Sequence, residues 1–210
     1  MTSDVEGDCR TVYAETRAFY ELNKARLGGC GFKVLYGPPL VRAPILFIGY
    51  QPGGDVEDGR AEEASGAHEW WPDVCEYATA DWRLAKNLRS MLGTDLLRRS
   101  TGMNAIFFRS PSADVYRKTV HKGLRQEAQQ FCKDRVERLI SVLDPQKIVV
   151  IGFDALRLFT SGTVGLSNSA GRVLTMHGEI AGIPTVASLH LSGAQIASSD
   201  RAAIAADILA

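Results

Sequence analysis

The chain has 210 residues, enough for one well-buried domain, whereas two domains would each fall near the small end of the usual range. Hydrophobic residues make up 45% and charged residues 23%, which excludes the composition of an intrinsically disordered chain. The 24 basic and 24 acidic side chains cancel, so any contact with nucleic acid must be a local patch. We therefore expect a single domain over residues 1–210.

The N-terminus and the hydropathy pattern bear on location. MTSDVEGDCR is polar and acidic where a signal peptide is basic and then apolar, and nowhere do 18 apolar residues run together. We expect a cytoplasmic protein without a membrane partner.

The first 80 residues predict a helix, a strand and a long irregular segment. Apolar residues at near-helical spacing predict an amphipathic helix over 4–27, which Gly28-Gly29 ends. The continuous apolar run ILFIG at 45–49 predicts a buried strand. Residues 50–80 are rich in Gly, Pro, Asp and Glu without periodicity, as is typical of functional or flexible segments.

The rest of the chain alternates between helices and strands. Asp81 is expected to cap a helix that reaches about Leu92, with a short turn through Leu96 and Leu97. The later predicted elements are a strand at 103–108, a helix at 122–143, a strand at 147–152, a helix at 154–159, strands at 172–178 and 183–190, and a helix from about 194. This order predicts an α/β fold with a largely parallel sheet and helices on both faces.

Four polar segments follow predicted strands, at 49–55, 109–112, 152–154 and 190–194. Ligands bind at the carboxyl ends of the strands in such folds. In GYQPGG (49–54) the glycines allow a ligand close to the backbone, although such a turn is more often only a connection. In HLSG (190–193), His190 and Ser192 could face an anion, or His190 could be an ordinary strand-end histidine.

Together these segments resemble the uracil-DNA glycosylase superfamily. The matching elements, in order, are GYQPGG at 49–54, MNAIFFRSPS at 103–112, PQKIVVIG at 145–152 and HLSGA at 190–194. The resemblance covers about residues 40–210. It implies a three-layer α/β/α fold with a four-stranded, mostly parallel central sheet. It also implies that a nucleotide of damaged DNA is drawn out of the duplex into a pocket at the strand ends.

The resemblance implies roles for particular residues. Gln51 would orient the attacking water, Asn104 would read the Watson–Crick edge of the base, and His190 would stabilise charge on the departing base. Ser192 would contact phosphate. The other expected substrate contacts are Gly49 and Tyr50, and the other expected DNA contacts are Gly53, Gly54, Arg109 and Gly193.

Aromatic stacking on the base is expected from the segment after the first motif. The candidates are Tyr50, Trp70, Trp71 and Tyr77, and core or loop packing is an equal alternative for each of them. The basic residues Arg109, Arg117, Lys118, Lys122 and Arg125 could contact phosphates or could form a solvated helix face.

The sequence also departs from the family pattern. Gln51 has no ionisable group and cannot be a general base, and Leu191 replaces the usual proline of the last motif. Asp55 and Asp58 could supply a carboxylate or could form a solvated acidic loop. Some branches hold an iron–sulfur cluster, but Cys9, Cys30, Cys75 and Cys132 contain no CxxC pair, so we expect buried free thiols and no metal or other cofactor.

Two functions from different classes follow. The leading hypothesis is a DNA repair glycosylase that hydrolyses the N-glycosidic bond of uracil or another deaminated base. The alternative is a catalytically inactive superfamily member that binds a nucleobase, a nucleotide or nucleic acid; the lack of an ionisable group at Gln51 favours it.

Overall fold

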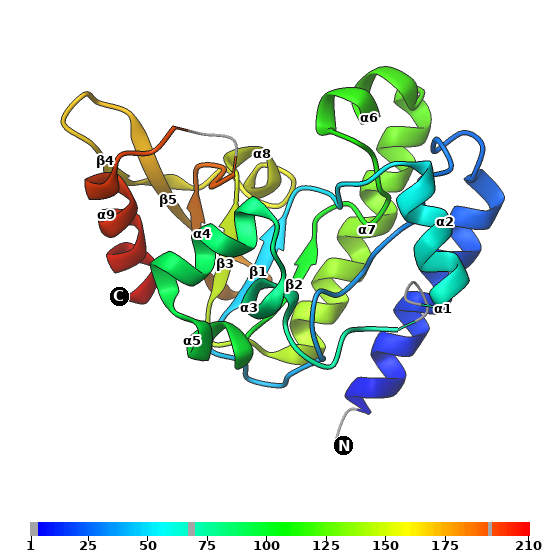
Figure 1. The fold of residues 1–210 in the computed structure, drawn as a ribbon, viewed down its shortest axis with the longest axis horizontal. Coiled ribbons are helices and arrows are strands. Elements are labelled where there is room, and N and C mark those ends of the chain that lie inside the picture. Colours follow the sequence, from blue (N-terminus) through cyan, green and yellow to red (C-terminus); the bar gives the residue numbers. More distant parts are fainter. Residues whose placement is uncertain (1–3, 67–69, 193–194) are drawn as a thin grey trace.

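The computed structural model describes residues 4–66, 70–192 and 195–210, and the chain forms an α/β fold around one six-stranded mixed sheet (Figure 1). Across the sheet the strands are β2 (Thr101–Asn104), β1 (Leu46–Gly49), β3 (Ile148–Ile151), β6 (Ile183–Ser188), β5 (Val173–Ile180) and β4 (Thr163–Ser167). The first four are parallel, whereas β5 and β4 pair antiparallel. The α/β prediction is confirmed. The prediction of a four-stranded sheet is wrong, because a two-stranded antiparallel extension continues the sheet beyond β6.

Helices lie on both faces of the sheet. They are α1 (Val5–Asn23), α2 (Val56–Ser65), α3 (Glu76–Thr79), α4 (Arg83–Leu92), α5 (Thr94–Arg98), α6 (Ala113–Thr119), α7 (Lys122–Leu143), α8 (Phe153–Leu156) and α9 (Ser198–Leu209). Helices α1 and α7 pack together against one face, and α3, α4, α5 and α9 cover the other (Figure 1). None of the described helices combines the length and apolar character needed to cross a bilayer.

The central strands β1 and β3 are buried on both faces, as their continuous apolar runs predict. In β1, Leu46 and Ile48 join the apolar cluster beneath α1 and α7, whereas Phe47 joins the cluster beneath α3, α4 and α9. This alternation is the two-residue period of a strand. The sheet therefore separates two apolar cores.

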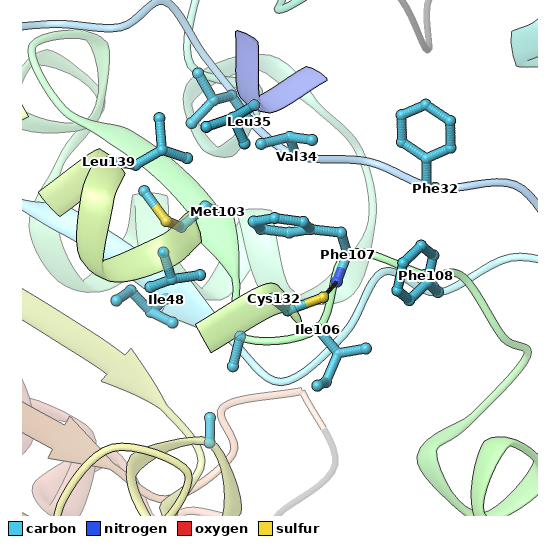
Figure 2. Close-up of a cluster of buried hydrophobic side chains, with 14 of the residues drawn as sticks. Phe32, Val34, Leu35, Ile48, Met103, Ile106, Phe107, Phe108, Cys132 and Leu139 are labelled. Carbon is cyan, nitrogen blue, oxygen red and sulfur yellow. Dashed lines mark hydrogen bonds between the residues drawn. The ribbon is translucent and has the colours of Figure 1, made fainter. Parts of the chain in front are cut away.

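The strand predicted at 103–108 is wrong in its bounds. β2 ends at Asn104, and the chain then crosses the end of β1, where the Ala105 amide donates to the Gly49 carbonyl at 2.8 Å. Phe107 and Phe108 are buried in the first core outside any strand, and the Phe107 amide donates to Cys132 Sγ at 3.4 Å (Figure 2). The apolar run therefore reflects burial of a crossing segment and not strand length.

Several short elements differ from the sequence predictions. The segment 50–80 contains α2 and α3, α6 follows the second strand, and β4 forms the sheet edge. The predicted cap at Asp81 is wrong: Trp82 occupies the N-cap position, and Asp81 instead lies near Lys86 at 3.7 Å. Periodicity is too weak a signal over elements of four to ten residues.

A segment before β1 runs beside β2. Leu35 forms an isolated antiparallel bridge with Met103, and the Tyr36 amide donates to the Gly102 carbonyl at 2.7 Å. This pairing places Tyr36 next to Asn104, the last residue of β2.

The C-terminal helix is attached to the antiparallel extension through one carboxylate. Asp207 on α9 accepts a hydrogen bond from Thr175 Oγ1 at 2.5 Å and lies 2.9 Å from His177 Nε2. Partial burial alone would raise the pKa of Asp207, but the contacts with Thr175 and His177 outweigh burial and lower it. The ionised carboxylate is thus favoured in the folded state.

We expect Asp207→Asn to lower the free energy of unfolding by about 1 kcal/mol at pH 7, the usual contribution of such a hydrogen bond. Because the folded-state pKa lies below the unfolded value, the stabilisation is present above the unfolded pKa and disappears as pH falls through the folded one. Urea unfolding of wild type and variant should therefore differ at pH 7, and the difference should shrink as pH falls below the ordinary aspartate pKa of 3.8. Glu179→Gln, at an exposed carboxylate on β5, is the control; an equal loss there would contradict the prediction.

Candidate functional site

One pocket of about 1130 Å³ lies at the carboxyl ends of the parallel strands. Its lining includes Gly49, Tyr50 and Gln51 after β1, Asn104 at the end of β2, Gly152 and Asp154 after β3, and His190 and Ser192 after β6. Figure 1 shows this edge of the sheet beside α8 and α6. The structure thus brings Gln51, Asn104, His190 and Ser192 together, as expected for side chains that follow parallel strands.

Asn104 is held at the base of the pocket. Its residue is only 3% exposed, and its Nδ2 donates to the hydroxyl of Tyr36 at 2.9 Å. The Oδ1 atom lies beside Gly49, and a Cβ at position 49 would be far inside van der Waals contact with it. The glycine therefore makes room for the amide of Asn104.

The side-chain amide of Gln51 is buried at the edge of the pocket. Neither its Oε1 nor its Nε2 has a hydrogen-bond partner within the described part of the chain. Unpaired buried amide atoms are costly, so they favour the binding of water or a polar ligand group there. Gln51 can position such a molecule by hydrogen bonds but cannot take a proton from it.

His190 lies at the rim of the pocket, with its Nδ1 3.0 Å from the hydroxyl of Ser192. Although the residue is exposed, the surrounding protein desolvates the imidazole and lowers its pKa below the ordinary value. The ring is therefore neutral at pH 7. When Ser192 donates to Nδ1, the proton lies on Nε2, and His190 can donate from that atom.

The last motif is anchored although Leu191 stands in place of proline. The Leu191 side chain is buried, and its carbonyl accepts a hydrogen bond from Asn87 Nδ2 of α4 at 2.7 Å. The hydrogen bond from Asn87 thus restrains the backbone at Leu191, as a proline ring at this position would do. Gly193 lies outside the described residues.

The turn after β1 is fixed by Arg109. Its buried guanidinium donates to the Gly53 carbonyl at 2.5 Å and forms an ion pair with Glu62 of α2. In this arrangement Arg109 supports the turn, and a direct contact with phosphate stays a prediction. Gly53 is exposed, and no atom lies near the place of a Cβ there, so its backbone is open to a ligand, as a DNA contact requires.

Asp55 and Asp58 form a capping box at the start of α2. The Asp55 side chain accepts from the Asp58 amide at 3.1 Å, and Asp58 Oδ2 accepts from the Asp55 amide at 3.0 Å. The structure thus gives these carboxylates a local structural role. Asp154, in the first turn of α8, also lines the pocket, and it pairs with Arg157 at 2.8 Å.

The candidate aromatic residues divide into two groups. Tyr50 and Tyr77 line the pocket, whereas Trp70 and Trp71 stack on each other, with Trp71 against Tyr13 of α1. Sequence reasoning missed three further aromatic lining residues, Tyr36, Trp82 and Phe153. Tyr36 lies in none of the sequence motifs, and its neighbour across the sheet could not be read from the sequence.

Basic side chains lie on α6 and at the start of α7, outside the lining of the pocket. Arg117, Lys118 and Lys122 are exposed, while Arg117 pairs with Asp114 at 2.6 Å. Ser112 and Ala113, at the start of α6, line the pocket. This arrangement is compatible with either a phosphate contact or a solvated face.

All four cysteines are free and buried. Burial raises the pKa of Cys75 to about 11 and that of Cys132 to about 12, so both thiols are protonated at neutral pH. Across residues 4–66, 70–192 and 195–210, no three His, Cys, Asp or Glu side chains form a group that could hold a metal ion.

No family model matches this chain, and no curated protein matches it significantly.

Proposed function

We propose that this protein is a DNA glycosylase of the uracil-DNA glycosylase superfamily, which hydrolyses the N-glycosidic bond of uracil or another deaminated base in DNA. One observation carries the proposal: Gln51, Asn104 and His190 follow three different strands and line one pocket. The order of their motifs along the chain supports it, and so does the parallel arrangement of β2, β1, β3 and β6. A cytoplasmic location is part of this proposal.

The chemistry assigns one task to each side chain. Water adds to C1′ of the deoxyribose as the bond to the base nitrogen breaks, and the electron pair of that bond leaves with the base. The Nε2–H of His190 donates to the negative charge that develops on the base, and the Asn104 amide holds the Watson–Crick edge. Gln51 orients the water, whose surplus proton passes to solvent because an amide cannot accept it.

The contacts with DNA are made by the rim of the pocket. Gly53 and Gly54 let the backbone approach a phosphate, and α6, which carries exposed cations, begins at the lining of the same pocket. Because the net charge of the protein is zero, we expect weak, salt-sensitive affinity from a few phosphate contacts.

The alternative is a superfamily member that binds a base or nucleotide without cleaving it. The amide at Gln51 favours it, because this position carries no carboxylate. The acidic residues that follow in the sequence, Asp55 and Asp58, form a capping box, although Asp58 also lines the pocket.

One assay separates the two functions. The protein is incubated with oligonucleotides that carry uracil, hypoxanthine or xanthine, in single and double strands, and abasic sites are then cleaved with alkali. Strand cleavage above that of a His190→Ala preparation supports the glycosylase. Binding of these oligonucleotides without any cleavage would contradict it in favour of the alternative.

A further inference from the structure

The strongest feature that the proposed function does not use is the contact between Tyr36 and Asn104. The Tyr36 hydroxyl accepts a hydrogen bond from Asn104 Nδ2 at 2.9 Å, and both residues line the pocket. Tyr36 belongs to none of the four sequence motifs, and it reaches the site because residues 32–36 run beside β2.

Tyr36 is itself held on several sides. Its ring stacks on that of buried Tyr77 with 5.6 Å between the centroids and 5° between the planes. The ammonium of Lys33 lies 4.8 Å from the ring centroid, and the same ammonium pairs with Glu76 at 2.6 Å. The backbone of Tyr36 bonds to Gly102 and Glu76 at 2.7 Å each. A side chain fixed in this way can impose its geometry on a neighbour.

The phenol is neutral at every physiological pH, because burial raises the pKa of Tyr36 to about 12. A neutral hydroxyl can accept from Nδ2 of Asn104, as it does here, and could equally donate to Oδ1 if the amide turned over. Tyr36 thus fixes the plane of the amide, not which of its two polar atoms faces the base.

The plane of the Asn104 amide needs a restraint because χ2 of asparagine, the rotation about the Cβ–Cγ bond, has broad and weakly defined minima. On the other side Gly49 leaves open the space that Oδ1 occupies, so it places no side chain against the amide. Besides the packing that buries Asn104, the hydrogen bond to Tyr36 gives its Nδ2 a directional restraint.

We propose that Tyr36 is a positioning residue, which holds the plane of the Asn104 carboxamide so that it meets the edge of an extruded base without prior rotation. This inference rests on the proposed function. Preorganisation of this kind lowers the cost of reaching the reactive geometry and contributes little to the affinity for the rest of the DNA.

A double-mutant cycle tests the inference. Tyr36→Phe keeps the ring and its stacking but removes the hydroxyl, so we expect the single-turnover rate on a uracil oligonucleotide to fall about tenfold, the usual effect of losing one hydrogen bond. In an Asn104→Ala background the same change should alter the rate by less than about twofold, because Tyr36 acts through Asn104. Equal falls in both backgrounds, or no fall in the first, would overturn the inference.

Tyr20→Phe is the matched control. The Tyr20 hydroxyl also accepts one hydrogen bond of 2.9 Å, from the Gly31 amide, but Tyr20 does not line the pocket. Any effect on the rate through general loss of stability should appear in this variant too. An effect of Tyr20→Phe as large as that of Tyr36→Phe would count against a positioning role.

A second measurement needs no substrate and separates this inference from the proposed function. In protein labelled with ¹⁵N-asparagine, Tyr36→Phe should shift the side-chain amide resonances of Asn104 and speed their exchange with solvent, whereas Tyr20→Phe should not. Unchanged Asn104 resonances overturn the inference even if the enzyme is active. If Tyr36→Phe shifts the Asn104 resonances but the wild-type protein excises no base, the proposal of a glycosylase is refuted, whereas the restraint of Asn104 by Tyr36 is supported.

Discussion

His190→Ala should lower the single-turnover rate on a uracil oligonucleotide by about a hundredfold, the usual effect of losing one preorganised donor to a developing anion. Affinity for the same DNA should stay within about threefold, because the donor contributes in the transition state more than in the ground state. The imidazole lies at the rim of the pocket with Ser192 on its Nδ1, and both features leave Nε2 available to the base. Rapid quench and fluorescence anisotropy measure the two quantities.

The control for His190 is a variant that keeps a donor. In His190→Gln the amide nitrogen can reach about the place of Nε2, so an intermediate rate is expected. Circular dichroism and thermal unfolding must show that each variant is folded, since His190 packs beside Gly152. A folded His190→Ala protein with the wild-type rate would remove His190 from the catalytic residues.

Gly49→Ala should also lower the single-turnover rate by about a hundredfold. The new Cβ would occupy the space of Asn104 Oδ1, so the amide must move by a large part of an ångström, and such a displacement of a substrate-orienting group costs about that much. Gly49 does not have a positive φ, so the substitution introduces no backbone strain and the effect reports on the contact itself. The ¹⁵N resonances of Asn104 should shift in parallel.

Gly123→Ala is the control for this substitution. Its Cβ would lie 3.5 Å from His121 Nδ1, an ordinary contact, on a helix outside the pocket. The rate of this variant should stay within about twofold of wild type, since ordinary surface changes have small effects. Should Gly49→Ala keep both the wild-type rate and the wild-type Asn104 resonances, the close approach of Gly49 to Asn104 would have no functional importance.

The sequence predicts best those elements whose pattern of apolar residues reflects burial in the core. The helix at 122–143 has the predicted bounds because seven of its apolar side chains face one core. The run at 45–49 is a strand buried on both faces. The carboxyl ends of the apolar runs at 45–49 and 183–190 place Gln51 and His190 at one edge of the sheet. Asn104 lies near the start of the strand predicted at 103–108, so its place there came from the family resemblance, and the structure shows that β2 ends at this residue.

Long-range contacts could not be predicted in the same way. The contact of Tyr36 with Asn104 spans 68 residues, and that of Asn87 with Leu191 spans 104. Neither leaves a local pattern, because each depends on how two distant segments pack. The antiparallel extension was underestimated for a related reason: β4 has only five residues and is mostly exposed, so the alternation of Val164 and Leu166 is too short a signal to reveal it.

The hydrogen bond from Asn87 to the Leu191 carbonyl joins the last motif to α4, and Arg201 of α9 lies 3.5 Å from the same asparagine side chain. The loop that carries His190 is thereby part of the cooperative unit formed by α4 and α9, and it opens only as readily as that layer does. Amide hydrogen exchange of Leu191 should therefore follow that of α4 across temperature. The lifetime of the His190 geometry is then governed by a helix layer on the face of the sheet, where the first residues of α4, Arg83 and Leu84, themselves line the pocket.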